Sequence, residues 1–424
     1  MTDPGSGGAT KALVLHPDVR TEDDRRDPRF ALDEALSLAG ALPGIEVLGG
    51  EIVRLPRARP GTLFGTGKVE EIGQRIAAEE IGLVLIDGPV TPVQQRNLEK
   101  AWKTKLLDRT GLILEIFSAR AATREGVLQV EMAALSYQRT RLVRAWTHLE
   151  RQRGGLGFVG GPGETQIEAD RRAIDEQLVQ LKKRLDKVAK TRGLHRAARA
   201  KVPFPVVALV GYTNAGKSTL FNRLTGSEVM AEDMLFATLD PTMRRVDLAE
   251  VGEVILSDTV GFISDLPTQL VAAFRATLEE VTAADLILHV RDVSHPETED
   301  QAADVRAILT ELGADRTPTL ELWNKIDRLD GEALERMVTQ AARRDDALPI
   351  SAVTGQGIDA ALAAVDAALR GERTETVVEL PAGDGRRRAW LYEQGVVQAE
   401  DAVEDGVRLQ VRWSSAQAAR FRRL

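Results

Sequence analysis

Two spacings of apolar residues alternate along the first part of the chain. Short apolar runs, typical of buried parallel strands, are followed by stretches in which apolar residues recur every three or four positions, the spacing of a helix. These patterns predict strands at residues 12–16, 45–55, 83–87, 105–107 and 111–117, and helices at residues 32–42, 69–79 and 92–102. We therefore expect a small parallel-sheet α/β subdomain at residues 11–118, after a polar N-terminus, residues 1–10, that we predict to be disordered.

A different pattern occupies residues 119–202. Apolar residues step by threes and fours in two series, separated by a glycine-rich loop, as expected for two helices packed along one seam. The first series is Leu128, Met132, Leu135, Leu142, Trp146 and Leu149, and the second is Ile174, Leu178, Leu181, Leu185 and Val188. This region is predicted to form a long antiparallel helical hairpin.

Strands and helices alternate again after Pro203 and Pro205, which mark a junction. Strands are expected at residues 206–210, 254–257, 286–292, 319–323 and 348–350, with helices at residues 297–312, 332–344 and 358–369. This alternation predicts a central α/β domain at residues 203–371. The last residues, 372–424, hold short apolar runs at 377–380, 386–391 and 407–413, and we expect a small C-terminal α+β domain there.

Composition favours a cytoplasmic protein. Its 424 residues suffice for several domains, and the lack of cysteine excludes disulfides and thiolate metal sites. No apolar run approaches the roughly 18 to 20 residues of a membrane span, and the first residues do not resemble a signal peptide. No metal-ligand spacing is found among the five histidines, which are His16, His148, His195, His289 and His295.

The net charge of −8 is distributed unevenly. Residues 139–201 contain 16 Lys or Arg against 7 Asp or Glu, a local charge of +9 that leaves −17 for the rest of the chain. Such segregation indicates a basic face for a polyanion on an otherwise acidic body.

The sequence GYTNAGKS, at residues 211–218, stands between an expected strand and an expected helix. Backbone amides of a glycine loop that enters a helix can meet the negative charges of a phosphate tail, and glycines let the chain lie close to it. Lys217 would then reach the β- and γ-phosphates, and the Ser218 hydroxyl would bind Mg²⁺. The predicted nucleotide contacts are Gly211, Tyr212, Thr213, Asn214, Ala215, Gly216, Lys217 and Ser218.

Three later motifs complete a guanine-nucleotide site. One strand ends in an acidic residue followed by a glycine. A GTPase site needs a second carboxylate near Mg²⁺ and a backbone amide that senses the γ-phosphate at this place. Another ends at a carboxylate, Asp327, that can accept hydrogen bonds from N1 and N2 of guanine, which adenine cannot supply. The motifs are Asp258, Thr259, Val260 and Gly261, then Asn324, Lys325, Ile326 and Asp327, then Ser351 and Ala352 beside the base. Their order predicts a P-loop GTPase domain that binds GTP or GDP with Mg²⁺.

The loop of the hairpin is rich in glycine and flanked by arginine. The residues concerned are Arg151, Arg153, Gly154, Gly155, Gly157, Gly160, Arg171 and Arg172. A Gly-x-Gly-x-x-Gly spacing occurs here, but it lacks the preceding strand of a dinucleotide site, so we reject that interpretation. A basic, glycine-rich tip is suited to contact RNA, and a flexible solvated loop is the alternative.

A second glycine loop, Gly65-Thr66-Gly67-Lys68, lies in the N-terminal subdomain. Because it lacks the second half of a phosphate-binding loop, we favour a structural turn or a partner contact over a second nucleotide site.

Taken together, these motifs resemble the HflX family of translation-factor-related bacterial GTPases. The resemblance rests on the GTP motifs, on residues 236–242 (FATLDPT), on residues 65–70 (GTGKVE) and above all on residues 154–172 (GGLGFVGGPGETQIEADRR). It spans about residues 11–371. It implies a monomeric GTPase that binds the large (50S) ribosomal subunit and its rRNA, and that splits or rescues stalled ribosomes under stress.

The resemblance also implies further site residues. Thr238 would be the switch threonine that closes on Mg²⁺ when the γ-phosphate is present. Spacing alone does not distinguish Thr238 from Thr242 in this role. The implied nucleotide contacts in this segment are Phe236, Ala237, Thr238, Leu239 and Asp240. Lys217, Thr238 and Gly261 are the expected catalytic residues.

Two positions bear on the rate of hydrolysis. Phe262 stands where many GTPases place a glutamine that orients the attacking water, so we expect slow intrinsic hydrolysis that the ribosome stimulates. In related GTPases an asparagine at the position of Asn214 helps to hold K⁺, which adds positive charge as the β–γ bond breaks, so K⁺ is a further candidate cofactor.

The rival hypothesis is a GTPase switch that acts on another RNA or RNA–protein target, for example in ribosome assembly, without splitting subunits. Transport across a membrane would require spans that the sequence lacks, and a catalytic RNA modifier should carry a cofactor site.

Overall fold

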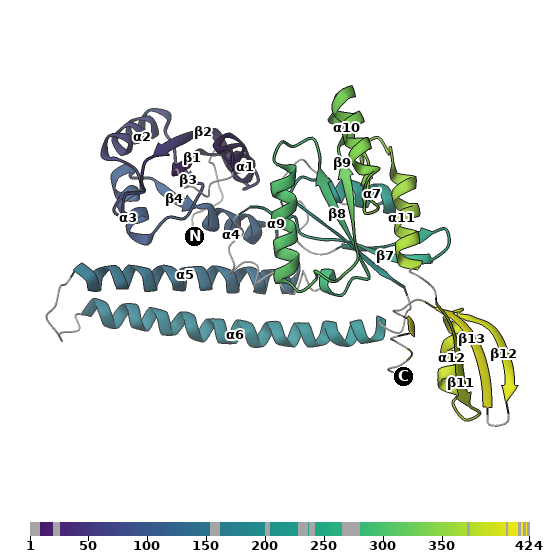
Figure 1. Ribbon diagram of the computed structural model, residues 1–424. Coiled ribbons are helices and arrows are strands. Elements are labelled where there is room, and N and C mark those ends of the chain that lie inside the picture. Colours follow the sequence, from purple (N-terminus) through teal and green to yellow (C-terminus); the bar gives the residue numbers. More distant parts are fainter. Residues whose placement is uncertain are drawn as a thin grey trace.

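The computed structural model describes residues 9–19, 26–152, 162–199, 204–227, 236, 242–264, 280–370, 374–403, 406–413, 417–418 and 421. Three sheets of four, six and three strands lie within these ranges (Figure 1). A pair of long helices runs beneath the first sheet, and the three-stranded sheet lies beyond the second. The fold is therefore α/β with a helical hairpin and a small C-terminal α+β unit, as predicted.

The N-terminal sheet is parallel, with strand order β2-β1-β3-β4. Its strands are β1 (Thr10–Val19), β2 (Ile45–Leu55), β3 (Leu83–Ile86) and β4 (Lys105–Asp108), and its helices are α1 (Pro28–Gly40), α2 (Thr66–Glu79) and α3 (Pro92–Trp102). Alternate residues of β1 enter two cores: Ala12 and Val14 pack with α1, whereas Leu13 and Leu15 pack with α2 and α3. A parallel sheet buried on both faces explains the nearly continuous apolar runs of the sequence.

One sequence prediction in this domain is wrong. Residues 111–117, expected as a strand, belong to helix α4 (Arg109–Arg120), which the Asp108 side chain caps by accepting from the amide of Gly111 at 2.8 Å. Five of its apolar residues are buried and only Glu115 interrupts the run, so the apolar positions are nearly continuous and show no clear helical spacing. They are Leu112, Ile113, Leu114, Ile116 and Phe117.

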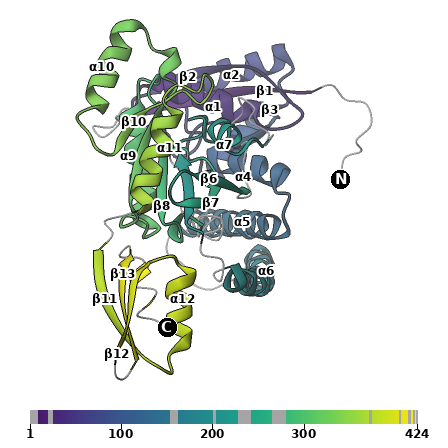
Figure 2. The same cartoon turned by 90° about the vertical axis from the view of Figure 1, so that its right-hand side faces the viewer.

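The predicted hairpin is present as α5 (Arg124–Gln152) and α6 (Pro162–Arg199), which lie side by side in Figures 1 and 2. The start of α5 packs against α4, where Leu128 and Val130 are buried. Farther along, Leu181 of α6 is buried as the seam predicted, while Val179 stays 54% exposed. The loop between the helices lies outside the described residues.

The six-stranded sheet has the order β10-β9-β8-β5-β7-β6. Its strands are β5 (Val206–Gly211), β6 (Thr242–Leu248), β7 (Gly252–Asp258), β8 (Leu286–Asp292), β9 (Thr319–Asn324) and β10 (Ala347–Pro349). All neighbours are parallel except β6 and β7, and β6 is an edge strand that the sequence analysis missed. The sheet carries α7 (Lys217–Thr225), α9 (Thr298–Glu311), α10 (Gly331–Ala341), α11 (Ile358–Arg370) and the short 3₁₀ helix η1 (Ile326–Arg328).

The C-terminal unit is an antiparallel sheet with one helix. Its elements are β11 (Thr374–Pro381), α12 (Gly385–Glu393), β12 (Val397–Val403) and β13 (Gly406–Trp413), with sheet order β11-β13-β12. Leu391 of α12 packs on Leu409 and Val411 of β13 to form a core of its own. Figure 2 shows this unit beyond the end of α11, away from the N-terminal sheet.

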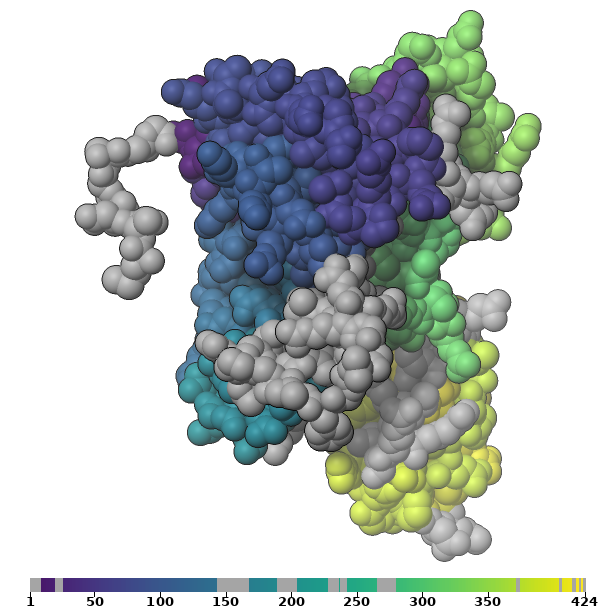
Figure 3. Space-filling view, turned by 90° about the vertical axis from the view of Figure 1, so that its left-hand side faces the viewer, coloured from purple at the N-terminus to yellow at the C-terminus, as the bar shows by residue number. Residues whose placement is uncertain are grey.

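The N-terminal and central sheets share a core. Phe117 of α4 and Phe236 of the central domain meet edge to face, with ring centroids 4.6 Å apart. The space-filling view shows the purple and blue N-terminal surface continuing into the green surface of the central domain (Figure 3). No helix in the described part of the chain is long and apolar enough to cross a membrane.

Candidate nucleotide site

The phosphate loop connects β5 to α7, and two of its glycines have no room for a side chain. Gly211 has φ +151°, and a Cβ there would lie 2.2 Å from the carbonyl oxygen of Val290 in β8. Gly216 has φ +94°, and a Cβ there would lie 2.3 Å from Nδ2 of Asn324. Both positions require glycine because the conformation is strained and the neighbouring atoms are fixed.

Lys217 is buried at the first position of α7. Its Nζ donates to the carbonyl oxygens of Gly211, at 3.1 Å, and Tyr212, at 2.9 Å. Burial lowers the pKa of Lys217 to about 8; the charge of Lys325 lowers it further, and that of Asp258 opposes the shift. An anion beside Nζ would compensate for this burial, as the phosphate tail of a nucleotide does.

The acidic side of the loop offers oxygen ligands. The Ser218 hydroxyl lies 2.8 Å from Oδ2 of Asp258, which is fully buried at the end of β7. Strands β5 and β7 are parallel neighbours, so the carboxylate and the loop meet at one edge of the sheet. A serine hydroxyl beside a carboxylate is a donor set that Mg²⁺ prefers, so the residues present fit this ion.

The segment after Asp258 is tied to the phosphate loop. Phe262 donates its amide to the Gly211 carbonyl at 3.1 Å and accepts from the amide of Thr213 at 2.6 Å. A Cβ on Gly261 would lie 2.8 Å from Cγ2 of Thr213 and 2.9 Å from Nζ of Lys217. The backbone at Gly261 therefore lies directly against the lysine that is expected to meet the phosphates.

Phe262 itself points away from this edge. Its ring is buried in the core shared with α4 and the N-terminal sheet. A phenyl ring has no polar group with which to orient water, and this one also lies buried in the core.

The predicted base-binding motifs are joined to the phosphate loop, within the described residues, by the side chain of Asn324. Asn324, buried at the end of β9, donates from Nδ2 to the Ala215 carbonyl at 2.8 Å and accepts from the Ala352 amide at 2.9 Å. Next to it, the Asp327 carboxylate accepts from the Ser351 hydroxyl at 2.5 Å. The structure thus brings the loop, the Asn324–Asp327 motif and the Ser351–Ala352 motif together.

Several predicted site residues lie elsewhere or outside the described chain. Phe236 is buried against Phe117, so its side chain belongs to the interdomain core. Arg171 and Arg172 are exposed on α6, where they pair within the helix with Asp175 and Glu168. The calls at Ala237, Thr238, Leu239, Asp240, Arg153, Gly154, Gly155, Gly157 and Gly160 lie outside the described residues, and of Arg151 only the helical backbone is described.

Sequence reasoning missed two sets of residues around the site. Asp292 ends β8 and pairs with Lys325, with Oδ2 2.8 Å from Nζ. The feature of the sequence that could have identified Asp292 is an acidic residue at the end of an apolar strand. Glu34 of α1 accepts a hydrogen bond from the Tyr212 hydroxyl, 178 residues away. No local pattern could have found that contact.

Comparison with known proteins gives consistent matches along the chain. Residues 30–118 match the family model for a GTP-binding GTPase N-terminal region, and residues 120–199 that for a GTP-binding GTPase middle region. Residues 206–325 match a 50S ribosome-binding GTPase domain, and residues 336–424 an HflX C-terminal domain.

Individual relatives cover almost the full length. A solved GTP-binding protein of the archaeon Sulfolobus solfataricus, in complex with GDP, is 23% identical, with a TM-score of 0.45 and coverage of 85% of this chain and 98% of that one. The GTPase HflX of Escherichia coli is 45% identical over 95% of this chain and 93% of its own. That of Magnetococcus marinus is 52% identical over 88% of this chain and 86% of its own. Identity at this level over most of the length shows that the chain belongs to the HflX family of GTPases.

Proposed function

We propose that this GTPase binds the large ribosomal subunit and splits or rescues stalled ribosomes under stress. The observation that carries the proposal is the connection of a guanine-nucleotide site to a long hairpin with exposed cations on α6. These cations are Arg171, Arg172, Lys182, Lys183 and Arg184. A polyanion such as rRNA would meet them through its phosphates. The match of residues 206–325 to a 50S ribosome-binding GTPase domain supports the same partner.

In this proposal the loop residues Gly211 to Ser218 hold the phosphates, and Asp327 selects guanine. Lys217 would exchange its bonds to the Gly211 and Tyr212 carbonyls for phosphate oxygens. Ser218 and Asp258, with Thr238, would hold Mg²⁺, which supplies positive charge to the phosphate oxygens when it is bound. Gly261, against Lys217, would offer its amide to the γ-phosphate.

The proposal also covers the domain limits, the oligomeric state, the rRNA contact and the rate of hydrolysis. We propose domain limits at residues 11–118, 119–202, 203–371 and 372–424, with the protein acting as a monomer. The hairpin tip, Arg151 to Arg172, would contact rRNA. Hydrolysis would be slow in isolation, since Phe262 offers no polar group for water, and faster on the ribosome.

The test is co-sedimentation of the protein with 70S ribosomes and with separated subunits, in a non-hydrolysable GTP analogue, in GDP and without nucleotide. We expect binding to the 50S subunit that is strong only with the analogue, and conversion of 70S particles into subunits when GTP is supplied. Lys217→Ala should lose both effects. Lys100→Ala, which removes an exposed lysine on α3, is the matched control and should keep them.

Two results would contradict the proposal in different ways. Absence of ribosome binding with every nucleotide would overturn the ribosomal partner and leave the GTPase with another target. Strong 50S binding without a change in the 70S population would retain the partner and refute splitting.

A further inference from the structure

Tyr212, in the phosphate loop, turns its side chain out of the nucleotide site and into the N-terminal domain. Its hydroxyl donates to Glu34 of α1 and accepts from the amide of Ser264 at 2.7 Å. Burial and the charge of Glu34 raise the pKa of Tyr212, so the phenol keeps its proton and remains the donor to the carboxylate. One hydroxyl thus joins the phosphate loop, the segment after Gly261 and a helix of another domain.

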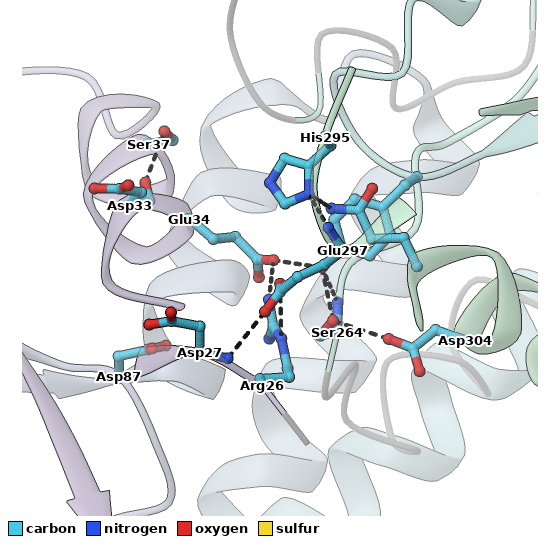
Figure 4. A network of polar contacts seen from close by, with 12 residues as sticks. Arg26, Asp27, Asp33, Glu34, Ser37, Asp87, Ser264, His295, Glu297 and Asp304 are labelled. Carbon is cyan, nitrogen blue, oxygen red and sulfur yellow. Dashed lines mark hydrogen bonds and ion pairs between the residues drawn. The ribbon is translucent and has the colours of Figure 1, made fainter. Parts of the chain in front are cut away.

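Ser264 is held from three directions. Besides its contact with Tyr212, it accepts at its carbonyl from Nη2 of Arg109 in α4 at 2.8 Å. Its hydroxyl donates to Asp304 of α9 at 2.9 Å (Figure 4). Ser264 is 4% exposed, so water does not compete readily for these bonds.

Glu34 is itself fixed by two arginines. Its Oε2 accepts from Nη2 of Arg26 at 2.9 Å, and its Oε1 accepts from Arg109. The Glu34 side chain is 9% exposed and that of Arg109 is 7% exposed, so this is a desolvated charge cluster. A carboxylate between two guanidinium groups has little freedom to move.

The cluster extends into both domains. Arg109 also donates to Asp87 at 2.6 Å, and Asp87 bonds His16 at 2.8 Å. On the other side, Arg26 lies 3.7 Å from Glu297 of the central domain. Glu297 in turn accepts from the amide of Asp27 at 3.0 Å, as Figure 4 shows. Each charged side chain named here around Glu34 therefore has an oppositely charged partner, although Nε of Arg109 and Oε2 of Glu297 make no hydrogen bond with the described residues.

We propose that Glu34 is a positioning residue for GTP hydrolysis, an inference that rests on the nucleotide site proposed above. Glu34 fixes the Tyr212 hydroxyl, and Tyr212 fixes the amide of Ser264. That bond sets the backbone between Gly261 and Ser264, where the γ-phosphate would be sensed. The N-terminal domain thus contributes to the geometry of a site that it does not enter.

The primary test is Tyr212→Phe, which removes one hydroxyl and keeps the ring. Single-turnover hydrolysis of GTP by the full-length protein, without ribosomes, should slow about tenfold, the effect of losing roughly one hydrogen bond from a positioned group. Affinity for GDP should change less than twofold, because the hydroxyl faces away from the nucleotide. Tyr392→Phe is the matched control: its hydroxyl donates to Glu400 at 2.6 Å on the C-terminal unit, and the variant should keep the wild-type rate.

Glu34→Gln should slow hydrolysis to a similar extent, and the double variant with Tyr212→Phe should be no slower than Tyr212→Phe alone. Arg26→Gln changes the more exposed of the two arginines that bond Glu34. It is a second perturbation of the same contact from the N-terminal domain and should lower the rate two- to threefold. Thermal unfolding confirms that each variant is folded.

Three results would overturn the inference. These are a wild-type rate for Tyr212→Phe, a loss of rate matched by an equal loss of GDP affinity, or fully multiplicative effects in the double variant. None of them depends on ribosomes, so a failure of the proposed ribosomal function is read separately, in the sedimentation test.

Discussion

The side chain of Asn324 offers the sharpest test of how the nucleotide site is held together. It is 2% exposed and makes two hydrogen bonds, from Nδ2 to the Ala215 carbonyl and from the Ala352 amide to Oδ1. Asn324→Ala removes the side-chain donor and the side-chain acceptor at once, so the Ala215 carbonyl and the Ala352 amide both lose their hydrogen-bond partner. The phosphate loop and the base loop would then lose the one described side chain that bonds to both backbones.

The magnitude follows from burial. Leaving a buried donor or acceptor unsatisfied costs about 1–3 kcal/mol for each group, and water entering the space left by the side chain offsets part of this. We expect a loss of about 3 kcal/mol in the free energy of unfolding. For a domain of roughly 150–250 residues, this lowers the melting temperature by roughly 6–12 °C.

Thermal unfolding and GDP affinity measured with a fluorescent analogue check this prediction. The control is Asn97→Ala: its exposed side chain also donates to a backbone carbonyl, that of Gly61 at 2.9 Å. That variant should lose less than about 0.5 kcal/mol, because the freed carbonyl is hydrated. Affinity for GDP should fall by about 10- to 100-fold in Asn324→Ala alone, since both loops lose their support.

Equal melting temperatures for the two alanine variants would refute the reasoning. They would mean that the two loops are held by their own backbones and that the buried amide is dispensable. A destabilised Asn324→Ala that retains wild-type GDP affinity would refute only the second step, from loop geometry to binding.

Three further predictions concern acid stability, base choice and the monovalent cation. Burial lowers the pKa of His289 to about 4. The folded protein therefore binds fewer protons than the unfolded chain between about pH 4 and 6.5, and stability should fall as the pH drops through this window, by about 2 kcal/mol between pH 7 and 5. His289→Gln should remove most of this loss in unfolding experiments at the two pH values, and an unchanged difference would contradict the assignment. Asp327→Asn should weaken GDP binding by about 100-fold or more while favouring XDP, because an amide cannot accept two bonds from guanine; a variant that still prefers GDP in competition titrations would disprove the assigned role. GTP turnover should be faster in KCl than in NaCl, and Asn214→Ala should abolish the difference; equal wild-type rates in the two salts would exclude the K⁺ hypothesis.

The nucleotide site could be predicted because its parts are local in sequence. The phosphate loop is a continuous run from Gly211 to Ser218, and its two glycines are required by close contacts with Val290 of β8 and Asn324 of β9. The same holds for most strands of the central sheet, whose burial on both faces produces plain apolar runs.

The remainder could not be predicted, for three physical reasons. Helix α4 exposes only a narrow face, with Glu115, Ser118 and Ala119, and its other apolar residues are buried in a nearly continuous run, so its sequence resembles that of a buried strand. Strands β6 and β12 have few buried residues, so they carry little apolar signal. The cluster around Glu34 joins residues that meet only when two domains pack together, and sequence spacing holds no information about that contact.

Helix α4 has a mechanical consequence. Its first residue, Arg109, bonds the carbonyl of Ser264, and its last residue, Arg120, donates to the carbonyl of Phe236 at 2.5 Å, beside the Phe117 ring. A helix of 12 residues is a stiff rod about 18 Å long. Because this one helix bonds both Phe236 and Ser264, we expect a displacement of either residue to be transmitted to the other. In the function proposed above, the segments that carry Thr238 and Gly261 would thereby be coupled through a helix that lies outside residues 203–371.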